Sequence, residues 1–218
     1  MSASEPQGSS IRNRTWAPLT LVGIAVYVAL DIILQLLPPH YSPIRQAESD
    51  LGVGPYGWLM SVNFVLRGAL TATAATAIAT AFPPAAQPRF GLILLWVFGV
   101  CSALLAFFPT DILDDRRLVP HPVATVHGEI HLLLALIAFV AAPLGALLIS
   151  FTLQRAPQLA PARTAAVALA VASAFSLLLL RVFARHHAGG LDERIFLACV
   201  LAWLAILAVR TCRARAPA

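Results

Sequence analysis

GEIHLLLALIAFVAAPLGALLIS, residues 128–150, is the stretch that decides the fold of this chain. Its acidic and basic side chains, Glu129 and His131, both lie near its start, and the residues that follow are almost entirely apolar. A helix of about 20 apolar residues spans the hydrocarbon core of a bilayer. The stretch therefore predicts a membrane-spanning helix that begins with titratable groups.

The composition of the whole chain agrees with this prediction. Of the 218 residues, 59% are hydrophobic and only 11% are charged, whereas about 25% are charged in soluble domains. The net charge of +5 comes from scattered arginines with no lysine, and no basic run is interleaved with aromatic residues as in nucleic-acid-binding proteins. We expect a membrane protein whose partner is membrane lipid, with no nucleic-acid partner.

Six apolar runs of spanning length follow one another along the chain, separated by proline and glycine breakers such as Pro38, Pro83 and Pro109. The predicted fold class is an all-α integral membrane bundle in one domain, residues 18–210. Residues 1–17 form a disordered cytoplasmic tail in this prediction, and residues 211–218 form a cytoplasmic C-terminal tail. The predicted spans are 18–37, 57–82, 90–108, 128–150, 164–183 and 192–210.

The arginines predict the orientation, because positively charged flanks stay on the cytoplasmic side. Eight arginines flank the spans on the side of the two termini, against four on the other side, or six if the borderline Arg181 and Arg194 are added. Both termini are therefore predicted to be cytoplasmic. Most acidic residues and all six histidines then fall on the outer side, together with two long connections, residues 38–56 and 109–126.

A histidine pair opens the fourth span. His127 and His131 are four residues apart and share a helix face, which suits a metal ion such as zinc. Glu129 points away from that face, so the pattern differs from the zincin motif. Asp111, which follows the third span, could orient a histidine or act as a base. The alternative for His127, Glu129 and His131 is that they cap the helix and lie among the lipid head groups.

Two charges lie within predicted spans, and a charge in lipid costs about 3 kcal/mol on insertion scales. Asp31 follows Tyr27 and precedes Gln35 on one stripe, and Arg67 shares a face with Asn63 and Thr71. We predict that Asp31 and Arg67 pair. Alternatively, Arg67 snorkels and Asp31 is protonated.

Further polar candidates lie at the outer ends of the spans. Ser49 and Asp50 could cap a short helix in the 38–56 connection. Asp192, Glu193 and Arg194 start the sixth span, where they could pair with Arg181 and Arg185. Cys101, Cys199 and Cys212 show neither a CxxC spacing nor a pairing pattern.

Several motifs resemble those of the bacterial and archaeal membrane family known as domain of unknown function 998: YSPIRQAESDLGVG before the second span, NFVLRG within it, FPTD after the third and HGEIH at the fourth. The resemblance covers about residues 16–210. It implies a six-helix protein without an established activity, with Ser49, Asp50, Asn63, Asp111, His127 and His131 at the positions of recurrent polar features.

The HxxxH spacing is also similar to the zinc site of alkaline ceramidases and adiponectin-receptor-type proteins. Those proteins have seven spans and take the histidine pair from the last one. A third ligand here would have to be His121, His186 or His187.

Two functions follow from these candidates. One is a metal-assisted hydrolase of a lipid head group or amide, in which His127 and His131 bind the metal and Asp111 orients a histidine or acts as the base. The Asp31 and Arg67 pair would form the floor of its cavity. The other is a noncatalytic membrane protein that uses the same cavity to bind a lipid or small polar ligand, or that regulates a partner. A transporter is less favoured, because the two halves show no matching broken helices.

Overall fold

All regular structure in the described part of the chain is helical, and six helices are long and apolar enough to span a membrane. The computed structural model describes residues 15–38, 40–111, 125–185 and 188–213. The six helices are α2 (Trp16–Leu36), α3 (Gly57–Ala81), α4 (Arg89–Leu104), α5 (Val126–Thr152), α6 (Arg163–Arg185) and α7 (Gly189–Arg213). The predicted fold class of a six-helix membrane bundle is confirmed.

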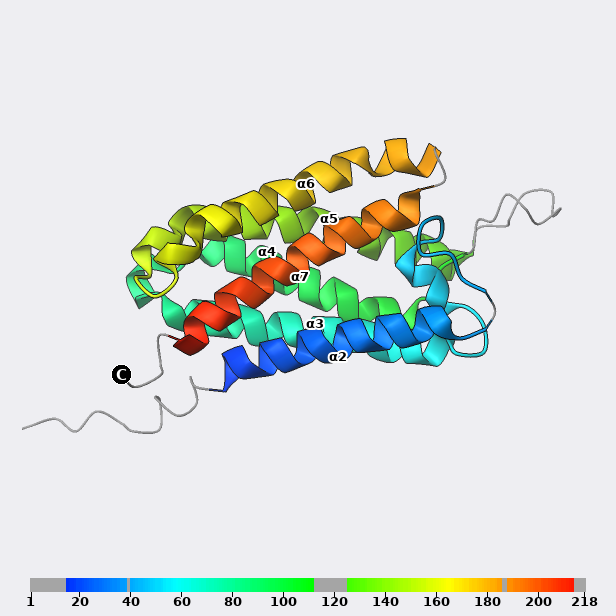
Figure 1. Ribbon diagram of the computed structural model, residues 1–218, viewed down its shortest axis with the longest axis horizontal. Coiled ribbons are helices and arrows are strands. Elements are labelled where there is room, and N and C mark those ends of the chain that lie inside the picture. The colour runs from blue at the N-terminus through cyan, green and yellow to red at the C-terminus, as the bar shows by residue number, and fades with distance from the viewer. Residues whose placement is uncertain (1–14, 39, 112–124, 186–187, 214–218) are drawn as a thin grey trace, which may run out of the picture.

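Short connections make α3 run antiparallel to α4, and α6 antiparallel to both α5 and α7. Each helix packs against the next in sequence, and α7 also packs against α2, so the six helices close into a ring (Figure 1). The start of α2 and the end of α7 lie at the same end of this ring. We call the opposite end, which carries the 38–56 loop and the starts of α5 and α7, the loop end.

Close helix packing in a membrane depends on small residues, because lipid tails are as apolar as leucine side chains. Gly68 of α3 and Gly99 of α4 face each other, and a Cβ on Gly68 would lie 2.7 Å from the Gly99 carbonyl oxygen. Large side chains fill the centre of the bundle, among them Phe98, Phe196 and Trp203. Trp203 Nε1 donates a hydrogen bond of 2.9 Å to Ser150 Oγ, which satisfies the indole in the core.

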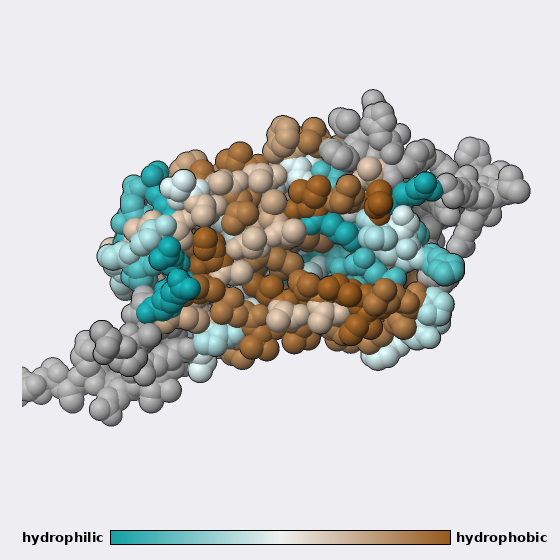
Figure 2. Space-filling view, in the orientation of Figure 1, coloured by the Kyte–Doolittle hydropathy of each residue, from teal (hydrophilic) through white to brown (hydrophobic). Residues whose placement is uncertain are grey.

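The helix faces on the exterior of the bundle are apolar instead of polar. Phe90 is 79% exposed and Leu178 is 76% exposed. Hydrophobic surface covers the middle of the molecule, and hydrophilic surface lies at its two ends and between α2 and α7 near the loop end (Figure 2). Exposed apolar sides on long helices are the arrangement that lipid requires, so the chain is a multi-pass membrane protein.

Candidate functional site

The polar side chains of the bundle gather around a cavity at the loop end. This loop-end cavity has a volume of about 890 Å³. Its wall is formed by the end of α2, the 38–56 loop, the segment that follows α4, and parts of α3, α5, α6 and α7. The 38–56 loop contains a short 3-10 helix, η1 (Glu48–Gly52), which brings Glu48 and Leu51 into the protein interior.

Arg67 pairs with Glu48 across the interior. Arg67 Nη1 lies 2.9 Å from Glu48 Oε2, and the two side chains are only 2% and 3% exposed. The Tyr27 hydroxyl donates a hydrogen bond to Glu48 Oε1 and accepts one of 3.3 Å from Arg67 Nη1. The Arg67 guanidinium also lies 5.1 Å from the centre of the Phe64 ring. A buried charge needs such a partner and such hydrogen bonds, because the interior cannot solvate it.

The predicted pair of Asp31 and Arg67 is therefore wrong. Asp31 Oδ2 accepts a hydrogen bond of 2.6 Å from Gln35 Nε2, one turn along the same helix. Glu48 is predicted to lie on the outer side with the other acids. In the structure η1 folds back toward the bundle, so that the Glu48 carboxylate is buried and contacts Arg67. The sequence does contain a signal for this pair. A buried arginine requires a counterion, and Glu48 and Asp50 are acids in the loop that precedes α3.

Asn63, Arg67 and Thr71 occupy one buried face of α3, as their spacing predicts. Thr71 Oγ1 donates a hydrogen bond of 2.7 Å to the Arg67 carbonyl oxygen. The Asn63 amide is fully buried and has no hydrogen-bond partner among the described residues. An unsatisfied buried amide usually marks the place of a water molecule or another polar group.

Arg194 fastens the 38–56 loop to α7. Its guanidinium donates hydrogen bonds to the carbonyl oxygens of Pro43, Gln46 and Gly190, at 3.1, 3.2 and 3.1 Å, and to the Tyr41 hydroxyl at 2.6 Å. Burial raises the pKa of the Tyr41 hydroxyl, so the group stays protonated at neutral pH. That hydroxyl donates in turn to the carbonyl oxygens of Gln46 and Ala47.

Gly190 and Glu193 bring the start of α7 against the same loop. A Cβ on Gly190 would collide with the Gln46 carbonyl, so only glycine permits this approach. Glu193 lines the loop-end cavity, and its Oε2 accepts a hydrogen bond of 3.2 Å from the Glu48 backbone amide.

Asp192 lies beside Glu193 and Arg194 at the start of α7, but its side chain contacts α6 instead of the 38–56 loop. Ser176 of α6 donates a hydrogen bond of 2.7 Å to its Oδ1. The predicted partners, the Arg181 and Arg185 side chains, lie outside the described part of the structure.

Ser49 and Asp50 lie within η1 and line the loop-end cavity. Their predicted role as helix caps is wrong, because Ala47 is the residue at the cap position and no side chain caps η1. The short helix itself was predicted correctly. Of its two acidic residues, Glu48 is buried and Asp50 lines the cavity.

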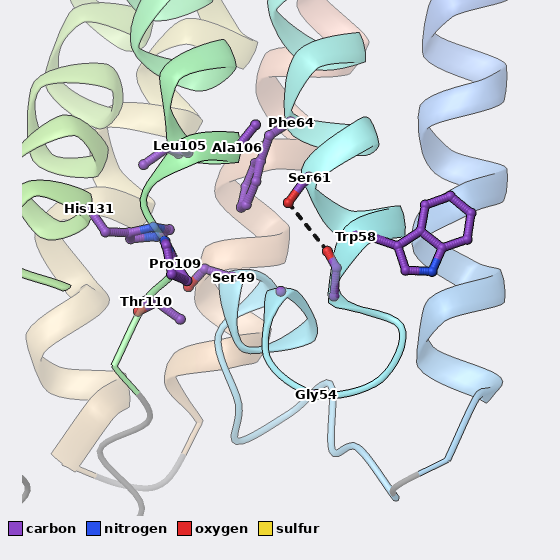
Figure 3. A pocket seen from close by; sticks show the side chains of 12 residues that line it. Ser49, Gly54, Trp58, Ser61, Phe64, Leu105, Ala106, Pro109, Thr110 and His131 are labelled. Carbon is purple, nitrogen blue, oxygen red and sulfur yellow. Dashed lines mark hydrogen bonds between the residues drawn. The ribbon is translucent and has the colours of Figure 1, made fainter. Parts of the chain in front are cut away.

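His131 closes a smaller pocket of about 280 Å³ that adjoins the loop-end cavity. The ring reaches from α5 toward Pro109, with Phe64 on the α3 side (Figure 3). His131 Nδ1 lies 2.6 Å from the Phe108 carbonyl oxygen, which can only accept, so Nδ1 carries the proton. Nε2 is then the ring nitrogen that remains for another partner.

Asp111 lines the loop-end cavity together with His131, whereas His127 lines neither of the two cavities. His127 is exposed, and its ring packs against Phe108 at a centroid distance of 5.9 Å. Asp111 accepts hydrogen bonds of 2.8 Å from both the backbone amide and the hydroxyl of Thr125. These bonds hold the pKa of the Asp111 carboxyl below its usual range.

Asp111 thereby stabilises the first turn of α5. Thr125 is the N-cap and accepts a hydrogen bond of 3.0 Å from the Gly128 backbone amide. A Cβ on Gly128 would collide with the Asp111 carboxylate. FPTD and the TVHG at the start of α5 therefore form one capping unit, in which Thr125 is the cap residue instead of His127, Glu129 or His131.

The ligand set for a metal ion is incomplete in the described part of the chain. No group of three or more His, Cys, Asp and Glu side chains there is placed to hold a metal. Glu129 is exposed and faces neither cavity. His121, His186 and His187, the predicted third ligands, lie outside the described residues. The assignment of His127 and His131 to a zinc site stays a prediction.

Comparison with known proteins places this site in a family. No curated protein matches the chain, and neither does any solved structure. A model of the family described as protein of unknown function (DUF998) matches residues 21–210, which include all six helices in whole or nearly so. The polar network and both cavities lie within the matched region. The chain belongs to the DUF998 family of proteins of unknown function.

Proposed function

We propose that this protein binds an amphipathic ligand, a membrane lipid, in the loop-end cavity without transforming it. The observation that carries the proposal is the division of the cavity wall. Arg67, Glu193 and Tyr41 form one polar part, whereas the α5 and α6 residues Leu132, Ala135, Phe139 and Leu180 form an apolar part.

The apolar part of the wall continues to the lipid-facing surface of the bundle. Leu132 lines the cavity and is also 71% exposed on the outside of α5. An acyl chain can lie along this side while the head group reaches the polar wall. The volume of about 890 Å³ falls in the range of about 300–1,000 Å³ that is typical of small-molecule sites.

The polar contacts support binding more than catalysis. A general base must be within reach of its substrate and free to take a proton. Asp111, the predicted base, is held by two hydrogen bonds from Thr125, and the Arg67 charge is neutralised by Glu48. The proposal places the protein in the cell membrane, with the loop end toward the outer leaflet, as the arginine distribution predicts.

A cavity-filling variant tests the proposal. Ala135→Trp fills the apolar part of the cavity, and Ala172→Trp places the same side chain on an exposed position of α6 as a control. Lipid that copurifies with the protein in mild detergent is quantified by mass spectrometry. We expect about one lipid per wild-type or Ala172→Trp molecule and a loss of at least 5-fold in Ala135→Trp. Equal lipid content in the two variants would overturn the proposal.

Metal analysis of the same wild-type preparation separates binding from metal-assisted hydrolysis. Since the described residues supply no third ligand, we expect far less than one equivalent of zinc, iron or manganese per chain. One equivalent that disappears in the His127→Ala/His131→Ala double variant would instead favour the hydrolase.

A further inference from the structure

Glu193 is an acidic side chain of the loop-end cavity that the described ion pairs leave without a cation. Its described hydrogen-bond partner is the uncharged backbone amide of Glu48. Arg67 forms its ion pair with Glu48, and the hydrogen bonds of Arg194 go to backbone carbonyls and Tyr41. Both nearby guanidinium groups are thus already engaged.

A carboxylate in such a position is costly. A charge that is removed from water requires a counter-charge or several hydrogen bonds, and the described residues supply one neutral N–H group. The carboxylate of Glu48, whose backbone amide binds Glu193, carries the same sign. A ligand with a positive charge would provide the missing counter-charge for Glu193 and would reduce its repulsion with Glu48.

The rest of the wall suits an alkylammonium group. Tyr41, Tyr56, Phe64 and Phe139 line the cavity together with Glu193, and aromatic faces attract cations and pack against methylene groups. An anionic head group would meet less unpaired positive charge inside the cavity. The buried Arg67 is neutralised by Glu48, and the other arginine of the wall, Arg45, is exposed to solvent.

We propose that the ligand of the loop-end cavity carries a protonated primary amine and that the Glu193 carboxylate binds it. The amine accounts for the acidic part of the wall, and its alkyl chain for the apolar part. The inference rests on the proposed function, because it names the head-group chemistry of the amphipathic ligand.

The test compares dodecylamine with N-acetyldodecylamine, which has the same chain and a neutral amide. Binding to the purified full chain in nonionic detergent is measured by isothermal titration calorimetry. One charge-assisted hydrogen bond gives about a 10-fold difference in Kd. We expect wild type to prefer the amine by at least this factor and Glu193→Gln to bind both probes equally. Glu129→Gln, which changes an exposed acid outside both cavities, keeps the preference of wild type.

The outcomes distinguish the inference from the function on which it rests. Equal affinities for the two probes in wild type, or an unchanged preference in Glu193→Gln, overturn the amine inference and leave lipid binding in place. No binding of either probe to wild type overturns both. Butylamine, which lacks the long chain, should bind at least 10-fold more weakly than dodecylamine; equal binding would overturn the assignment to an amphipathic amine.

Discussion

At the scale of single residues, the interior of this protein is organised by Glu48 and Arg67. The carboxylate comes from a loop and the guanidinium from the middle of α3, and their charged atoms meet at 2.9 Å. Tyr27 donates to the carboxylate and also contacts the guanidinium. Removal of one partner of such a pair is more costly than removal of both, because the remaining charge is left buried.

Glu48→Gln is therefore expected to destabilise the fold by about 3–5 kcal/mol, since it leaves the Arg67 charge unpaired. Glu48→Gln/Arg67→Met should recover at least half of the loss, because no buried charge remains. Equilibrium unfolding in detergent measures both values, and Glu129→Gln serves as an exposed control with an expected change below about 0.5 kcal/mol. A Glu48→Gln variant as stable as wild type would show that the pair does not stabilise the protein.

Arg194 supplies a second test at this scale, because its guanidinium holds loop carbonyls to α7. Arg194→Gln should let the loop open more often and speed amide exchange at residues 44–47 by about 10-fold, which corresponds to the loss of hydrogen bonds to a charged group. Hydrogen exchange with mass spectrometry measures this rate. Arg45→Gln, at an exposed position of the same loop, should leave it unchanged. Equal exchange in the two variants would contradict the role of Arg194.

At the scale of elements, the start of α5 is stabilised by a cap that lies beside the histidine pair. Asp111 binds Thr125, Thr125 binds the Gly128 amide, and Gly128 has no side chain to displace the carboxylate. Unpaired N–H groups at a helix start need such acceptors. The cap also fixes where the 109–126 connection rejoins the bundle.

Hydrogen bonds from Thr125 lower the pKa of Asp111 in the folded state, so the cap stabilises the protein at pH values above the ordinary carboxyl pKa. This contribution is lost as the pH falls through the lowered, folded-state pKa. We expect Asp111→Ala to have a lower Tm than wild type at pH 7 and the difference to be smaller at about pH 2, below the ordinary carboxyl range. A difference in Tm that is the same at both pH values would contradict an ionised cap.

The double variant Asp111→Ala/Gly128→Ala provides an internal control for the cap. Gly128→Ala alone should lower Tm, because its Cβ displaces the carboxylate. Once Asp111 is alanine the same change should cost less, since no carboxylate remains to be displaced. Additive losses in Tm would show that the two residues act independently.

At the scale of the whole molecule, six antiparallel helices form a closed ring with the start of α2 and the end of α7 at one end. The polar network and both cavities lie at the other end. The arginine distribution predicts that the termini are cytoplasmic and that the cavities open on the outer side. A ligand would then enter from the outer leaflet.

A C-terminal fusion tests this orientation. Green fluorescent protein fused after the last residue should fluoresce, and alkaline phosphatase fused at the same place should be inactive, because the first reporter folds in the cytoplasm and the second outside it. When the same two reporters are inserted into the 38–56 loop instead, the phosphatase should be active and the green fluorescent protein should not fluoresce. An active phosphatase at the C-terminus would reverse the predicted orientation.

The sequence alone determined the class of protein and the extent of its helices. Apolar runs of spanning length predict membrane helices because each run must satisfy its backbone within lipid, which is a local requirement. The stripe of Asn63, Arg67 and Thr71 also follows from spacing along one helix. The need of Arg67 for a partner is equally local, since it follows from a charge within an apolar run.

Only the tertiary structure decided which groups meet. Asp31 and Glu48 are both acids near the loop end, and the choice of Glu48 as the partner of Arg67 depends on how η1 folds back between the helices. The joining of Asp111 to Thr125, and of Arg194 to the 38–56 loop, also depends on the paths of connections that carry no periodic pattern. Such contacts are set by distances between segments remote in sequence, so spacing within one helix cannot specify them.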